Sequence, residues 1–228
     1  MRANPPRTED ELLGRALSLE GRRLGPIAEG LGLRAPADLR RNKGWVGELL
    51  ELALGAAGGA AAACDFPDLG VELKTVPLDE RGRPRESTCV CVASLGPESL
   101  ASWEDCWLRA KLARVLWVPV LGRGAPGSRV VGRARLWSPS VREEALLRAD
   151  WEELSGQLGL GRFDELDARW GEVLQLRPKA ASSRERRWAM SAEAEWVQVN
   201  PRGFYLRARF VARVLSGLAD LDGTPPNQ

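Results

Sequence analysis

Segments of strand length alternate with segments of helical spacing along this chain, and this alternation constrains the fold more than any other feature. Residues 115–120 read VLWVPV, an apolar run typical of a buried strand, while residues 71–76 alternate polar and apolar side chains. Residues 44–55 and 141–154 have helical spacing. We therefore expect a mixed α/β fold, with residues 1–228 forming one domain.

Local signals define the expected elements more closely. Thr8 and Glu11 have the spacing of a capping box, which predicts a helix through Leu19. The strand at 71–76 and the segment 87–94 flank the turn sequence DERGRP, so we expect them to pair as a β-hairpin. We also expect helices from Pro26, at 103–111, at 164–170 and at the end of 204–218, strands at 129–136 and 173–176, and a disordered tail at 219–228.

The absence of histidine excludes whole chemistries. Without an imidazole there is no Ser–His or Cys–His nucleophile pair, so acid–base work must fall on carboxylates and lysine. The four cysteines lack the paired CxxC spacing of zinc sites, and we expect them to be reduced, apolar residues. No stretch approaches the roughly 20 apolar residues of a membrane span, so we expect a cytoplasmic protein that does not contact a membrane.

Positive charge is concentrated near the carboxyl terminus, although the formal net charge is only +2. Residues 177–214 hold nine Lys and Arg against three Glu, a balance of +6. Such a block can contact nucleic-acid phosphates, although a solvated surface is an equally good interpretation on charge alone. Only four of the 33 basic residues are lysines: Lys43, Lys74, Lys111 and Lys179. In a chain that otherwise uses arginine, this favours positions that require a compact ammonium group, and chance is the alternative.

The most informative local motif is DFPDLGVELK at residues 65–74. Asp65 precedes a strand, and the period-two geometry of that strand places Glu72 and Lys74 on one face. Two carboxylates there suit magnesium, which prefers hard oxygen ligands and keeps waters that can act as nucleophiles. Lys74 would orient such a water or screen developing negative charge. The alternative is an exposed hairpin with an ordinary ion pair.

Glu51 adds to this hypothesis. It lies among Leu49, Leu50 and Leu52 on the helix that leads into the loop before Asp65. A carboxylate in apolar surroundings needs a partner, and either a metal ion or an arginine would serve.

Seven segments, taken in order, resemble the MutH-type mismatch repair endonucleases, whose fold is related to that of type II restriction enzymes. They are NKGWVGELLE (42–51), DFPDLGVELKT (65–75), KLARVLWVPV (111–120), LWSP (136–139), DWEEL (150–154), LQLRPKA (174–180) and PRGFYL (201–206). The resemblance covers most of the chain, and the ordered series is highly specific.

The resemblance implies a restriction-endonuclease-like fold with two arms, approximately residues 8–102 and 103–218, around a DNA-binding cleft. It implies a magnesium-dependent endonuclease, with manganese as a substitute, that nicks the unmethylated strand at hemimethylated GATC sites. It also implies binding of double-stranded DNA and stimulation by MutL, which acts after MutS has found a mismatch. We expect a monomer, with a homodimer as the alternative.

The same resemblance implies roles for individual catalytic residues. Asp65, Glu72 and Lys74 match the catalytic carboxylate–carboxylate–lysine motif of the family. Glu51 matches its additional acidic residue, so Glu51 joins Asp65 and Glu72 as an expected metal ligand. Lys111 matches a lysine close to that site.

DNA contacts are implied for a second set of residues. Arg177, Pro178 and Lys179 match the loop that reads the GATC sequence, and Arg177 suits bidentate contact with guanine. Tyr205 matches the tyrosine that senses adenine methylation, and Lys43 matches a DNA-proximal lysine.

Two other functions remain open from the sequence. A restriction endonuclease that cuts both strands of GATC would usually need two active sites, whereas this chain has a single copy of the motif. A non-catalytic DNA-binding module would be marked by a lost motif residue, yet Asp65, Glu72 and Lys74 are all present. The chain departs from the family at Cys89, where an aromatic residue near the active site is expected.

Overall fold

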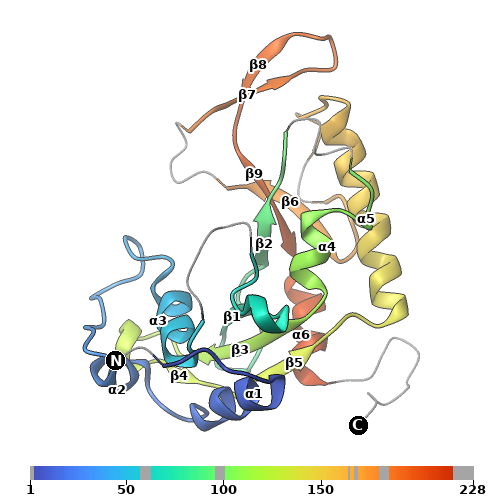
Figure 1. Cartoon of the computed structure of the whole chain (residues 1–228). Helices are drawn as coiled ribbons and strands as arrows, with labels where there is room; N and C mark the ends of the chain where they lie inside the picture. Colours follow the sequence, from blue (N-terminus) through green and yellow to red (C-terminus); the bar gives the residue numbers. More distant parts are fainter. Residues whose placement is uncertain are drawn as a thin grey trace. The chain divides into compact units, whose positions relative to one another are not determined.

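A computed structural model describes residues 3–56, 63–95, 101–163, 165–166, 169–179 and 185–217 (Figure 1). The chain divides into two compact units, each made of two segments. Unit 1 comprises Met1–Glu86 and Ala113–Ser138, and unit 2 comprises Ser87–Leu112 and Pro139–Gln228. Both units contain helices and strands, so the chain is mixed α/β, consistent with a restriction-endonuclease-like fold. The division into two arms, 8–102 and 103–218, around a DNA-binding cleft stays a prediction.

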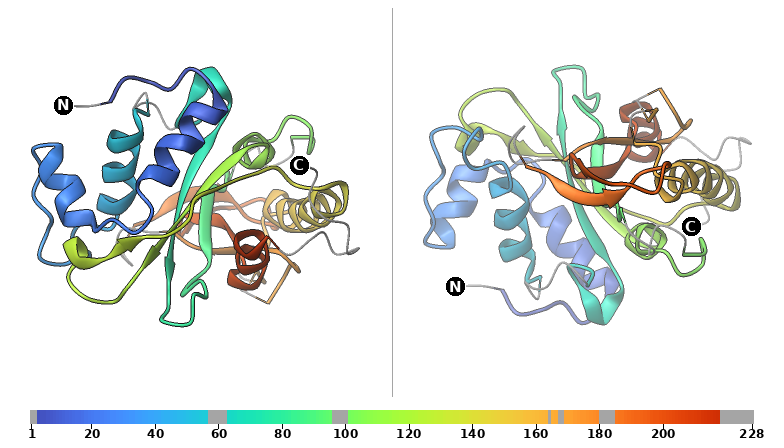
Figure 2. Two further views of the ribbon diagram at one scale, coloured as in Figure 1. Left: turned by 90° about the horizontal axis from the view of Figure 1, so that it is seen from below. Right: turned by 90° about the horizontal axis from the view of Figure 1, so that it is seen from above.

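Unit 1 packs three helices against one side of a sheet (Figure 2). The helices are α1 (Glu9–Ser18), α2 (Leu24–Gly30) and α3 (Trp45–Leu54), and the strands are β1 (Glu72–Leu78), β3 (Val115–Leu121), β4 (Val130–Val131) and β5 (Arg135–Trp137). Strand β1 is parallel to β3, and both β4 and β5 are antiparallel to β3. The predicted cap of the first helix is confirmed, because the Thr8 side chain accepts a hydrogen bond from the Glu11 backbone N–H at 3.1 Å.

The side chains of β1 alternate between the apolar core of unit 1 and the face that carries the candidate catalytic residues. Leu73 belongs to the apolar core, with Leu116 and Val118 of β3 and Leu49 of α3. Glu72 and Lys74 occupy the alternate positions of β1, so they lie on the face opposite to Leu73. The apolar residues of the strand therefore fix where its charged residues point.

The described part of unit 2 contains a three-stranded antiparallel sheet, a separate two-stranded ribbon and three α-helices. The sheet has the order β2 (Thr88–Val92), β9 (Arg202–Leu206), β6 (Leu174–Pro178), the ribbon pairs β7 (Arg187–Met190) with β8 (Trp196–Val199), and the helices are α4 (Trp107–Leu112), α5 (Val141–Gly159) and α6 (Ala208–Ser216). On α5 the buried Asp150 carboxylate accepts hydrogen bonds from the backbone N–H groups of Glu172, Val173 and Leu174. These bonds tie the start of β6 to the longest helix.

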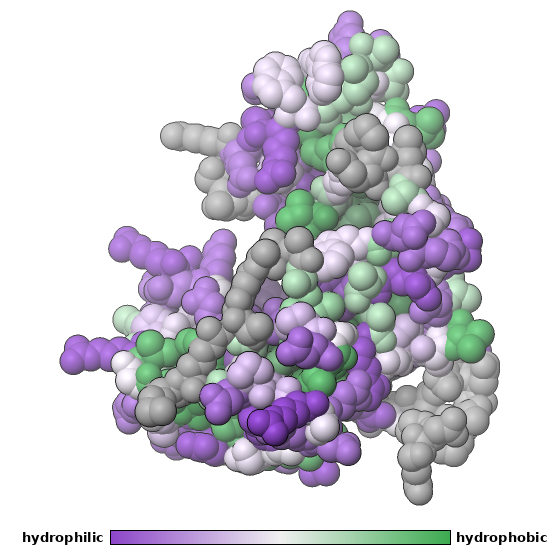
Figure 3. Space-filling view, viewed as in Figure 1, coloured by the Kyte–Doolittle hydropathy of each residue, from purple (hydrophilic) through white to green (hydrophobic). Residues whose placement is uncertain are grey.

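The ribbon explains part of a region for which the sequence suggested no structure. Its outer face carries Trp188, Met190 and Trp196, which are all exposed, while Ala189 on the other face is buried. Figure 3 shows pale side chains on this ribbon, with both purple and green surface beside them. The two most exposed tryptophan side chains of the described residues therefore lie on β7 and β8.

The expected hairpin between residues 71–76 and 87–94 is wrong. Strand β1 pairs with β3 over its full length, whereas β2 pairs with β9 in the other unit. Only the turn itself resembles a hairpin, because Leu78 bridges Pro84 and Arg85 N–H donates to the Pro77 carbonyl. The apolar β3 offers β1 a longer and more deeply buried partner than β2 does.

Other expectations need smaller corrections. The strand expected at 129–136 is interrupted into β4 and β5, and α4 starts at Trp107 rather than near residue 103. The strand β9 occupies the beginning of the segment 204–218, and its expected helix is α6. The tail at 219–228 and part of the helix expected at 164–170 lie outside the described residues. Among the described helices, none is both long and apolar enough to cross a bilayer.

Candidate active site

A buried ion pair forms the centre of the candidate active site. The Lys74 Nζ donates a hydrogen bond to Glu72 Oε1 at 2.6 Å, and the Glu72 side chain is only 3% exposed. A buried carboxylate is strongly disfavoured without a partner, and the ammonium supplies one. The predicted placement of Glu72 and Lys74 on one face of the strand is confirmed, and the exposed hairpin with an ordinary ion pair is not what the chain forms.

Asp65 is tied to the same strand through the backbone. Its Oδ2 accepts a hydrogen bond from the Leu73 N–H at 2.7 Å, between the two charged residues of the pair. A short 3₁₀ helix (Pro67–Leu69) and Gly70, with φ at +64°, return the chain to Val71, which bridges Phe66. This compact turn holds the Asp65 carboxylate against β1.

Glu51 shares the electrostatic surroundings of this group. It is half-buried on α3, and burial is the largest cause that raises the pKa of its carboxyl group. The negative charges of Asp65, Glu48 and Glu72 raise its pKa further, and Lys74 lowers it. The structure therefore brings Glu51, Asp65, Glu72 and Lys74 into one cluster within unit 1, as the sequence predicts.

The donor chemistry of this cluster fits a magnesium ion. Glu51, Asp65 and Glu72 offer carboxylate oxygens, the hard ligands that Mg²⁺ prefers. Burial, and after it the charges of the neighbouring carboxylates, raise the pKa of Glu51, and a divalent cation would relieve the part due to the carboxylates. In the described part of the chain, however, no three Cys, Asp or Glu side chains are grouped as a formed metal site. The carboxylates must therefore reorient to coordinate a cation, because Lys74 and the Leu73 N–H hold two of them.

A second cluster of predicted residues lies in unit 2, at one end of its sheet. The Arg177 guanidinium carbon is 5.7 Å from the centre of the Tyr205 ring, a cation–π contact between β6 and β9. Lys179 follows β6, and its N–H donates to the Pro201 carbonyl at 2.8 Å. Arg177, Pro178 and Lys179 are all exposed, so their side chains can reach an external ligand.

Gly203 makes this close arrangement feasible. It pairs with Arg177 across the sheet, and a Cβ atom there would lie 3.0 Å from Lys179 Cδ and 3.2 Å from Tyr205 Cε2. No local signal in the sequence identifies this role, because it depends on strands far apart in the chain. On the other side of β9, Cys89 of β2 lies opposite Tyr205, so the departure from the expected aromatic falls beside the predicted methylation sensor.

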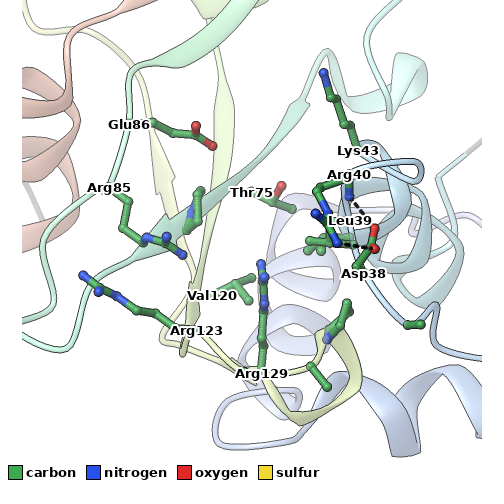
Figure 4. Close-up of a pocket in the computed structure, with 16 residues that line it drawn as sticks. Asp38, Leu39, Arg40, Lys43, Thr75, Arg85, Glu86, Val120, Arg123 and Arg129 are labelled. Atoms are coloured by element: carbon green, nitrogen blue, oxygen red, sulfur yellow. Dashed lines mark hydrogen bonds and ion pairs between the residues drawn. The ribbon is translucent and has the colours of Figure 1, made fainter.

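The two remaining lysines lie in different surroundings. Lys111 is buried on α4 of unit 2, with its Nζ 5.0 Å from the centre of the Trp107 ring. Lys43 is exposed just before α3 and lines a pocket in unit 1 (Figure 4). Their catalytic and DNA-binding roles stay predictions.

Comparisons with known proteins identify the family of the chain. The family described as DNA mismatch repair enzyme MutH matches residues 54–150. The DNA mismatch repair protein MutH of Klebsiella pneumoniae subsp. pneumoniae is 50% identical over 216 residues, which cover 94% of each chain. The chain belongs to the MutH family. The MutH proteins of Serratia proteamaculans and Escherichia coli O9:H4 are 49% and 48% identical, and each alignment covers 93% of this chain and 94% of the relative.

Within this MutH-family fold, sequence reasoning overlooked a group of arginines as well as Gly203. Arg85, Arg123 and Arg129 line the same pocket as Lys43 although they come from separate segments. No spacing along the sequence could have grouped them, because only the pairing of β3 with β4 and the path after β1 brings them together.

Proposed function

We propose that this chain is a magnesium-dependent DNA endonuclease of methyl-directed mismatch repair, which nicks the unmethylated strand at hemimethylated GATC sites. Membership of the MutH family makes a role in DNA mismatch repair the starting point. The observation that carries the proposal is the buried Glu72–Lys74 pair, with Asp65 hydrogen-bonded to the backbone between them. Phosphodiester hydrolysis needs charge stabilisation and an activated water but no histidine.

Each catalytic side chain has a separate task in this proposal. Glu51, Asp65 and Glu72 would hold the cation, which when bound activates a water molecule and neutralises phosphate charge. Lys74, oriented by Glu72, stabilises the negative charge that develops on the phosphate oxygens. Both groups lie on a buried strand, so once the carboxylates have turned toward the cation, little further reorganisation is needed as the charge develops.

The second cluster would supply sequence and methylation reading. Arg177 suits a bidentate contact with guanine O6 and N7 in the major groove. Lys179 would contact the same reading region, and the Tyr205 ring, packed beside Arg177, would discriminate against an added methyl group on adenine. The basic block at 177–214 would add phosphate contacts that weaken as the salt concentration rises.

Control by a partner completes the proposal. We expect a monomer with weak activity alone, stimulated by MutL after MutS has found a mismatch. A partner that favours the DNA-bound, cleavage-competent arrangement raises activity by shifting a population.

The test is cleavage of a supercoiled plasmid with one GATC site, prepared unmethylated, hemimethylated and fully methylated, in magnesium, with and without MutL. We expect nicking of the unmethylated strand, stimulation by MutL and protection by full methylation. Cutting of both strands of unmethylated plasmid would show a restriction enzyme instead. Binding of GATC without any metal-dependent cleavage, even with MutL, would show a non-catalytic DNA-binding module.

A further inference from the structure

A pocket of about 970 Å³ lies wholly within unit 1 and has no role in the mechanism above. Figure 4 shows its lining side chains, which come from the segment before α3, from β1, from the connection after β1 and from the loop between β3 and β4. Thr75 and Pro77 of β1 line it. They alternate with Lys74 along the strand, so the pocket lies on the other face of β1 from the Glu72–Lys74 pair.

The pocket is strongly basic. Its lining holds five cationic side chains and two acidic ones: Arg40, Lys43, Arg85, Arg123 and Arg129 against Asp38 and Glu86. Asp38 is engaged by Arg40 through both its backbone N–H and its guanidinium. The remaining positive charge faces a cavity lined by no aromatic side chain among the described residues. Such a lining suits an anion and offers no stacking surface for a nucleobase.

Arg129 supplies a second, independent observation. Its Nε is buried and has no hydrogen-bond partner among the described residues. A buried donor left without an acceptor is unfavourable for the folded state. Figure 4 shows the Arg129 side chain extending into the pocket from the residue before β4. An anion there would complete the hydrogen bonding that the protein leaves unfinished.

We propose that this pocket binds backbone phosphates of DNA flanking the GATC site, an inference that rests on the proposed function. Arginine is suited to the purpose, because its planar fork matches two phosphate oxygens at once. Arginines from different loops would hold two phosphates of one DNA strand. These contacts would extend the DNA-binding surface beyond the bases that are read. Such contacts fix position and register and carry no sequence information.

The experiment measures DNA affinity without metal, so that no cleavage occurs. Arg85→Ala combined with Arg123→Ala removes two exposed pocket charges, and Arg7→Ala combined with Arg81→Ala removes two exposed charges of unit 1 outside the pocket. Labelled duplexes without GATC are used in a short form and in a form longer by about 10 bp, one helical turn. Affinity is followed by fluorescence anisotropy over a range of salt concentrations.

We expect the pocket variant to bind the longer duplex on the order of tenfold more weakly than the control variant. Its slope of log affinity against log salt should fall by about 0.9 for each phosphate that the protein no longer neutralises. Equal affinities and slopes for the two variants would overturn the proposal. A thermal shift by pyrophosphate that the pocket variant lacks, together with equal DNA binding, would also overturn it and would assign the pocket to a free anion.

The readout is independent of nicking. If the wild type fails to nick GATC while the pocket variant still binds the longer duplex more weakly, the proposed function fails and the phosphate pocket stands. If nicking occurs and the two variants bind DNA alike, the proposed function stands and the pocket assignment fails.

Discussion

The two clusters of predicted site residues differ in how the fold holds them. In unit 1, Glu72 is 3% exposed and Lys74 is 16% exposed, and the strand backbone anchors Asp65 beside them. In unit 2, Arg177 and Lys179 are exposed, and the Arg177 guanidinium lies over the Tyr205 ring. The residues proposed to act on the phosphate are therefore largely held by burial and backbone contacts, whereas those proposed to read bases are accessible.

Free energy explains this division. Burying the Glu72–Lys74 pair is unfavourable in itself, and such a pair adds little to stability compared with well-packed apolar residues. Its retention in the core of a strand therefore favours a functional reason. An exposed arginine carries a smaller desolvation penalty, and it can adapt its side chain to a base edge.

Asp65→Asn tests the fixed cluster of unit 1, which consists of Glu51, Asp65, Glu72 and Lys74. It should have the largest effect. The amide oxygen can still accept the hydrogen bond from the Leu73 N–H, so the fold should persist. Loss of the negative charge should lower metal-dependent nicking by at least about 10³-fold, or about 4 kcal/mol of transition-state stabilisation. Single-turnover nicking of hemimethylated GATC measures it, with DNA affinity expected to be unchanged or higher.

Asp68→Asn is the matched control, because Asp68 is an exposed carboxylate in the same short turn. It should nick DNA at nearly the wild-type rate. Equal losses in the two variants would mean that the turn, rather than the Asp65 carboxylate, is what matters.

Arg177→Lys tests the accessible cluster of unit 2, which consists of Arg177, Pro178, Lys179 and Tyr205. Its effect should be smaller. Lysine keeps the charge but loses the planar fork that makes bidentate contact with guanine. We expect discrimination between GATC and a site with a changed guanine to fall by roughly 1–3 kcal/mol, about 5- to 150-fold. The comparison is of nicking rates on the two sites, and Arg187→Lys, at an exposed position of β7, is the control. An unchanged ratio would remove Arg177 from base reading.

The fixed cluster could be predicted from the sequence because its parts are local. Asp65, Glu72 and Lys74 lie within ten residues, and strand periodicity alone places two of them together. Strand pairing is not local: β1 and the segment 87–94 were expected to pair because they are neighbours in the chain, yet each finds a more favourable partner elsewhere. Gly203 and the arginine pocket were missed for the same reason.

Gly203→Ala tests the geometry of the accessible cluster without removing any charge. The added Cβ would lie 3.0 Å from both Lys179 Cδ and the Cys91 carbonyl oxygen, so neighbouring groups must shift. We expect roughly 1 kcal/mol loss in GATC selectivity, about fivefold, through displaced reading residues. Gly156→Ala on α5 is the control, because nothing lies near its Cβ position, and it should stabilise the helix by about 0.5–1 kcal/mol. Selectivity unchanged by Gly203→Ala would mean that the reading cluster tolerates displacement.

The smallest expected effect concerns the stability of the fixed cluster without metal. Burial and neighbouring carboxylates raise the pKa of Glu51 above its ordinary value of 4.5. The folded chain therefore binds a proton more tightly than the unfolded chain, and stability decreases as the pH rises through the window above 4.5. Glu51→Gln removes this penalty, so the metal-free protein at pH 7 should gain on the order of 0.5 kcal/mol after solvent screening is allowed for.

Melting temperatures in a metal chelator measure this gain, which should shrink as the pH falls and vanish well below 4.5, where wild-type Glu51 is protonated in both states. Glu48→Gln, at an exposed position on the same helix, should change the melting temperature less. Magnesium should reverse the order of stability, because only the wild type keeps the third carboxylate for the cation. A Glu51→Gln protein that is less stable than the wild type in chelator would show that Glu51 serves the fold. The evidence that the fixed cluster reduces the stability of the metal-free protein, in contrast to the accessible cluster, would then be lost.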